Sequence, residues 1–73
     1  MRKEEQRGYE DALAWAKGKS REEIEKQIAK VKKDLSFFDL VMLKHAEVER
    51  DNEFWLNYFY LRGWLEGLKR SRK

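Results

Sequence analysis

Residues 54–68 read FWLNYFYLRGWLEGL and place ten large apolar or aromatic side chains in fifteen positions. The longest nearly uncharged part, from Phe54 to Leu61, is far shorter than the roughly 20 residues with which a helix spans a bilayer, and Arg62 and Glu66 follow it. Length therefore excludes a transmembrane helix. This run must lie in a core, against another protein or against nucleic acid.

As a helix, residues 54–68 are apolar around more than one side. Their second half is amphipathic, but Trp55, Leu56 and Phe59 project from the side that Arg62 and Glu66 occupy one or two turns later. A helix of this kind has to be covered on several sides. A strand is disfavoured because no other segment of the chain offers a pairing partner. We predict that Trp55, Leu56 and Phe59 lie in an interface.

Two interfaces are compatible with this pattern. The first is a contact with another protein, either a second copy in a homodimer or a partner's groove. The second is a contact within the chain, in which a first helix covers the run through Tyr9, Leu13 and Trp15. The chain has 73 residues and no Cys, and a single core of this size supplies only about 3–5 kcal/mol. Association is therefore expected.

Helix signals dominate the rest of the sequence, which contains no Pro. A first helix is predicted at about Glu4–Lys17, with Gly18 as the residue that ends it. Ser20 and Glu23 then form a capping box that begins a second helix. These signals predict an all-α fold, a small bundle of three to four helices.

The second predicted helix carries the clearest apolar stripe, formed by Ile24, Ile28, Val31 and Leu35 at steps of four, three and four residues. The sequence Ser36-Phe37-Phe38-Asp39 repeats the capping pattern and predicts that a third helix begins there. Whether this helix continues through Asp51 and Asn52 is left open by the pattern.

Positive charge is concentrated at the C-terminus. The first 68 residues carry 13 basic and 14 acidic side chains, so the whole excess comes from a basic tail, residues 69–73, that follows a domain of residues 1–68. This distribution makes direct nucleic-acid binding the alternative function, because such proteins usually carry a positive face on the fold itself. The phosphate contacts would then come from Lys69, Arg70, Arg72 and Lys73.

Residues for chemistry are scarce. The hydroxyl nucleophiles are Ser20, Ser36 and Ser71, of which the first two are assigned to helix caps, and His45 is the single histidine. A zinc site needs more nitrogen or sulfur ligands than this. We therefore expect no enzyme activity, no cofactor and no metal. The N-terminus lacks the apolar segment of a signal peptide, so a cytoplasmic protein is expected.

A short echo relates Gly8–Leu13 (GYEDAL) to Gly63–Leu68 (GWLEGL). Two such copies in a helical chain are more often chance than duplication. We therefore infer no internal duplication from the similarity of these two segments.

The middle of the chain resembles the Hha/YmoA family of small nucleoid-associated modulators. The similar residues span a little over half of the sequence and align without gaps: Ser20, Ile24, Glu25, Ile28, Lys30, Lys32, Leu35, Ser36, Leu40, Ala46, Arg50, Glu53, Asn57 and Tyr60. Members of that family are all-helical, are not enzymes, and bind the oligomerisation domain of H-NS so that the complex silences genes more selectively.

The resemblance implies a regulator of transcription that acts through protein contacts, partly by charged side chains. Glu25 and Arg50 would belong to that interface. The family's acidic contact residue is replaced by Val48, so either Glu47 or Glu49 supplies the charge or the contact is absent. The proline-containing loop of the family is also missing.

Overall fold

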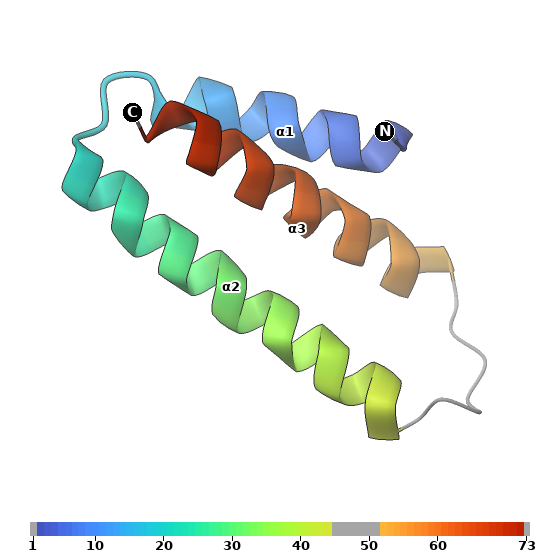
Figure 1. Ribbon diagram of the computed structural model, residues 1–73. Coiled ribbons are helices and arrows are strands. Elements are labelled where there is room, and N and C mark those ends of the chain that lie inside the picture. Colours follow the sequence, from blue (N-terminus) through green and yellow to red (C-terminus); the bar gives the residue numbers. More distant parts are fainter. Residues whose placement is uncertain (1, 45–51, 73) are drawn as a thin grey trace.

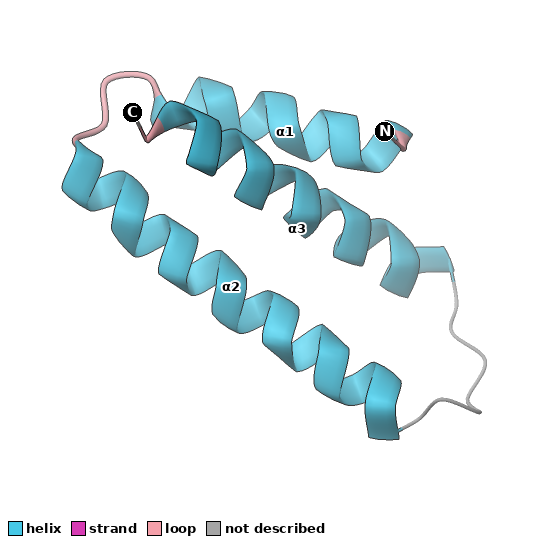
Figure 2. Ribbon diagram, viewed as in Figure 1, coloured by secondary structure: helices cyan, strands magenta, loops and turns pink. Residues whose placement is uncertain are grey.

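Three helices make up the part of the chain that the computed structural model describes, residues 2–44 and 52–72 (Figures 1 and 2). Helix α1 covers Lys3–Ala16, α2 covers Arg21–Lys44 and α3 covers Asn52–Ser71. No strand occurs in these two ranges. The predicted all-α class is therefore confirmed, with three helices in the described residues.

The first helix boundary is confirmed. Gly18 has a φ of 77°, the left-handed conformation that glycine adopts without strain, and the Lys19 amide donates to the Ala16 carbonyl at 3.1 Å. At the start of α2, the Glu23 amide donates to the Ser20 hydroxyl oxygen at 3.2 Å. Ser20 is thus the N-cap that the sequence predicted.

The predicted helix start at Ser36 is wrong, because Ser36 lies inside α2. Its hydroxyl donates to the Lys32 carbonyl at 3.0 Å, a bond that serine can make without leaving a helix. No Gly or Pro interrupts α2 around Ser36. The helix therefore does not end before Ser36, and no new helix begins there. α3 begins at Asn52, and the open question of continuity through Asp51 falls on residues 45–51, outside the described residues.

The central helix is α3, which packs against both α1 and α2. Figure 1 shows α1 and α3 running in the same direction and α2 running in the opposite one. The molecule is elongated, with extents of 42 × 22 × 14 Å. The main contacts are those of α3 with α1 and with α2, so the helices share a shallow core.

Glycines bring α1 and α3 into backbone contact. A Cβ on Gly8 would overlap the carbonyl oxygen of Tyr60, and a Cβ on Gly63 would overlap that of Glu5. A Cβ on Gly67 would lie 2.7 Å from the Tyr9 carbonyl oxygen. Small residues at four-residue spacing are the usual means by which two helix backbones approach this closely. Gly8 and Gly63, which begin the two similar segments, thus lie in the contact between α1 and α3.

Buried apolar residues gather where α1 and α3 end and α2 begins. The core consists of Ala12, Ala16, Ile24, Ile28, Val31 and Leu68, and we call these six residues the closed end. Leu68 is fully buried, and three members of the predicted α2 stripe are 3–4% exposed. Trp15 and Trp64 pack against the closed end with ring centroids 6.0 Å apart. The predicted stripe is therefore confirmed as core.

Candidate protein interface

The opposite end of the molecule is built from aromatic rings. A series of contacts runs from Phe38 on α2 to Phe54 on α3 (centroids 5.1 Å apart), from Phe54 to Trp55 (5.5 Å) and from Trp55 to Phe59 (6.1 Å). We call the rings and the leucines beside them the aromatic end: Phe37, Phe38, Leu40, Phe54, Trp55, Leu56, Tyr58 and Phe59. Such ring contacts are worth about 0.5–1.5 kcal/mol each beyond the area they bury.

The aromatic end is open to solvent. Phe37 is 65% exposed, Leu40 54%, Leu56 47% and Trp55 36%. These four are the exposed large apolar side chains of residues 2–41 and 53–72, and all of them belong to the aromatic end. Contiguous exposed apolar surfaces are typical of interaction sites, so the aromatic end is the candidate interface.

A difference in helix length explains the exposure on α3. α3 has 20 residues and α1 has 14, so α3 is about 9 Å longer. The two helices end close together (Figure 1), and α1 begins beside Phe59, where the Arg2 guanidinium lies 4.4 Å from the ring centroid. The first turns of α3, which carry Trp55 and Leu56, therefore extend past α1.

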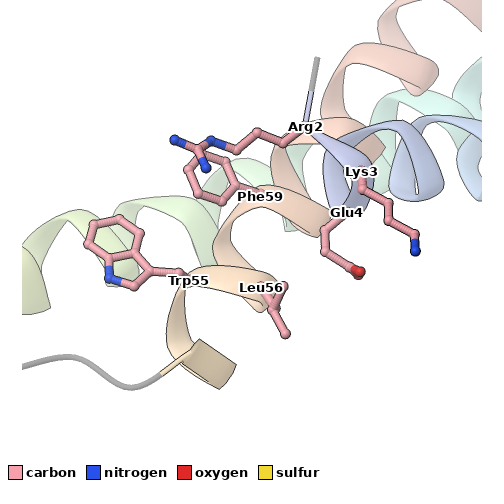
Figure 3. Close-up of a pocket in the computed structure, with 6 residues that line it drawn as sticks. All are labelled: Arg2, Lys3, Glu4, Trp55, Leu56 and Phe59. Carbon is pink, nitrogen blue, oxygen red and sulfur yellow. The ribbon is translucent and has the colours of Figure 1, made fainter.

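A cleft of about 700 Å³ lies at this step between the two helices. Its lining comes from the start of α1 and the first turns of α3: Arg2, Lys3, Glu4, Trp55, Leu56 and Phe59. Figure 3 shows the Arg2 side chain across the Phe59 ring, with Trp55 and Leu56 projecting from α3 beyond the start of α1. A volume of this size accommodates a large apolar side chain from another molecule.

The three apolar residues predicted to form an interface have different surroundings. Phe59 is half-buried and is covered by Arg2, so the first helix reaches this one residue. Trp55 and Leu56 stay exposed, because the α1 residues proposed to cover them lie further along the helix pair. Cover from the start of the first helix is thus shown for Phe59.

Of the charged residues predicted for the interface, Glu25 lies within the described ranges. Glu25 sits near the start of α2, where its carboxylate lies 3.4 Å from the Arg72 Nε, at the opposite end of α2 from Phe37. Glu47, Glu49 and Arg50 lie outside the described residues. The structure therefore does not bring Glu25 together with the aromatic end.

The predicted basic tail is largely part of α3, which continues through Ser71. The Ser71 hydroxyl donates to the Gly67 carbonyl at 2.9 Å, and Arg72 is held by Glu25. Lys69 and Arg70 are exposed on the last turn, whereas Lys73 lies outside the described residues. The boundary predicted between residues 68 and 69 thus falls within a helix.

A polar contact joins α1 to α3. The Tyr60 hydroxyl donates to the Asp11 carboxylate at 2.5 Å. This hydrogen bond raises the pKa of Tyr60 above its ordinary value, because it stabilises the protonated hydroxyl, and partial burial acts in the same direction. The contact helps to set how far along α3 the first helix begins.

Sequence reasoning missed the exposure of Phe37 and Leu40, because they were assigned to the start of a separate helix. The available signal was the uninterrupted helical composition of α2, which extends these residues past the buried stripe. No helix of the described residues is long and apolar enough to cross a membrane, and those residues contain no cluster of His, Asp or Glu placed to hold a metal ion.

Comparison of the chain with models of known families, with curated proteins and with solved structures finds no significant match. The resemblance to the Hha/YmoA family therefore depends on the aligned residues alone.

Proposed function

We propose that this protein is a small non-enzymatic regulatory protein that contacts another protein through its aromatic end. The observation that carries the proposal is the concentration of the exposed large apolar side chains of the described residues at one end of the fold. Phe37 and Leu40 stand on α2 and Leu56 on α3, and the intervening rings connect them. Aromatic residues in such a patch are the usual anchors of protein contacts.

The Hha-like version of this proposal names a nucleoid protein similar to H-NS as the partner. It is supported by the position of Leu40 and Asn57, two residues that carry the family resemblance and are exposed on α2 and on the first turns of α3. We expect a purified H-NS oligomerisation domain to bind the wild type and Ala29→Glu equally, and to lose affinity for Leu40→Glu. Equal affinity for all three proteins, or for none, would contradict this version.

A site-specific cross-linking experiment tests the general proposal. A photoreactive phenylalanine derivative replaces Leu56 at the aromatic end or, as a matched control, exposed Ala29 on α2, and cells of the native host are irradiated. We expect protein adducts from position 56 and few from position 29, with the partner identified by mass spectrometry as a host protein or a second copy. Absence of adducts at position 56, or equal yields at both positions, would refute the proposal.

Direct nucleic-acid binding is supported less well, since Arg72 is held in an ion pair with Glu25. Lys69 and Arg70 alone offer few phosphate contacts. We expect no retention of DNA by the purified protein at ~50 mM salt. Retention that falls steeply with salt and disappears in the Lys69→Ala/Arg70→Ala double variant would favour this alternative instead.

A further inference from the structure

We infer that the aromatic end is a two-fold interface between two copies of this chain. The inference rests on the proposed function and names its partner. The chain exposes 5561 Å², whereas a folded monomer of 8.9 kDa exposes about 4800 Å². The excess of about 750 Å² is close to the roughly 800 Å² that each partner buries in a standard protein interface.

The exposed large apolar side chains lie at one end of the molecule. At the closed end, Ala12 and Leu68 are fully buried. At the aromatic end, Phe37 and Leu40 are more than half exposed on the same helix that contributes Ile28 to the core. Surface that a second copy covers should therefore lie at the aromatic end.

The shape of the chain gives the second argument. Its radius of gyration is 13.2 Å, compared with about 11 Å for a compact domain of this length. Two elongated chains that pack at the aromatic end would share a deeper core than one shallow layer of helices provides. The dimensions therefore favour an assembly over an isolated chain.

Self-complementary shape gives the third argument. A two-fold interface uses the same patch on both copies, so each patch must carry both a projection and a receiving surface. The projecting side chain is Phe37 on α2, and the receiving surface is the cleft beside Leu56. Both features lie on one aromatic end, joined through Phe38 and Phe54.

Sedimentation equilibrium of the purified full chain tests the inference. We expect the wild type to sediment at twice the chain mass of 8.9 kDa at ~50 µM. Phe37→Glu and Leu56→Glu should each raise the dimer dissociation constant at least about 100-fold, since a two-fold interface contains every substitution twice. Both side chains are exposed in the single chain, so helicity by circular dichroism should be kept.

The matched control is Ala29→Glu, which adds the same charge at an exposed position of α2 outside the patch and should remain dimeric. A monomeric wild type at ~500 µM would overturn the inference, as would a dimer that Phe37→Glu and Leu56→Glu leave intact. If the wild type is monomeric while position 56 still cross-links to a host protein, the dimer is wrong and the proposed function stands. If position 56 yields no adduct either, both are wrong.

Discussion

The closed end and the aromatic end are both formed by α2 and α3, but apolar side chains are buried at the first and exposed at the second. On α2, Ile28 is 3% exposed at the closed end and Phe37 is 65% exposed at the aromatic end. On α3, Leu68 is fully buried and Leu56 is 47% exposed. Apolar content alone therefore does not determine which residues form the core.

The difference between the ends follows from how α1 meets α3. Close backbone contact at Gly8, Gly63 and Gly67 sets the position of α1 along α3. α1 has 14 residues and begins beside Phe59, and Leu56 on the first turns of α3 is 47% exposed. α1 therefore completes the core at the closed end. At the aromatic end the same helix contributes the edge of a cleft.

The largest expected effect contrasts Leu68→Ala with Leu56→Ala. Removing the buried Leu68 side chain leaves a cavity and should lower the free energy of unfolding by about 3 kcal/mol. Leu56→Ala should change it by less than about 0.5 kcal/mol in dilute solution, where association is absent. Urea unfolding followed by circular dichroism measures both. Equal losses would mean that the two ends are not different in the single chain.

The next effect tests the helix contact that separates the ends. Gly63→Ala places a Cβ on the Glu5 carbonyl oxygen, so α1 and α3 must move apart, at a cost of about 2 kcal/mol. Glu66→Ala, at an exposed position of the same helix, should stay within about 0.5 kcal/mol of wild type. If thermal unfolding shows Gly63→Ala to be as stable as Glu66→Ala, the close contact is absent.

A smaller difference in stability is expected between substitutions of Ser20 and Ser36, the two serines that begin a helix-capping pattern in the sequence. Ser20→Ala removes the acceptor of the Glu23 amide and should cost about 1 kcal/mol. Ser36→Ala, inside α2, should be neutral or stabilising by about 0.5 kcal/mol. Denaturant midpoints of the two variants measure this difference. A loss of similar size in Ser36→Ala would indicate that a helix begins there after all.

A still smaller effect concerns the contact between Tyr60 and Asp11. Tyr60→Phe removes its hydrogen bond to Asp11 and should cost about 0.5 kcal/mol, because the pair is exposed. The raised pKa of Tyr60 means that folding favours the protonated hydroxyl. Its contribution is therefore complete below the ordinary tyrosine pKa and is lost as the pH rises through the higher pKa of the folded state.

Unfolding of wild type and Tyr60→Phe at pH 8 and pH 11 measures this dependence. The difference between the two proteins should shrink at the higher pH. A difference that is unchanged or larger at pH 11 would contradict the assigned contact.

Local signals allowed much of the fold to be predicted. Gly18, Ser20 and the Ile24, Ile28 and Val31 stripe act within one or two helical turns, so their roles can be inferred from neighbouring residues. Ser36 misled the prediction because its hydroxyl can cap a helix or bond back within one, and the local sequence is the same in both cases. The contact of Gly8 with α3 joins residues more than fifty positions apart, beyond any local pattern.

The candidate interface was predicted in part. The excess apolar circumference around Trp55 and Leu56 is visible in the sequence, because Arg62 and Glu66 mark the same side one or two turns later. The contributions of Phe37 and Leu40 depend on the length of α2 relative to its neighbours. The pattern of side chains along the sequence does not give the relative lengths of packed helices. The exposure of Phe37 and Leu40 therefore became evident only from the structure.

Side-chain footprinting with hydroxyl radicals at low and high protein concentration tests whether a second copy covers the aromatic end, because it measures solvent access at both ends of the molecule in one sample. We expect oxidation of Phe37, Trp55 and Leu56 to fall at least about threefold between ~1 µM and ~500 µM chain, as the second copy covers them. Trp15 and Trp64, packed at the closed end, should keep constant rates. Constant rates at Phe37, Trp55 and Leu56 across this range would contradict the claim.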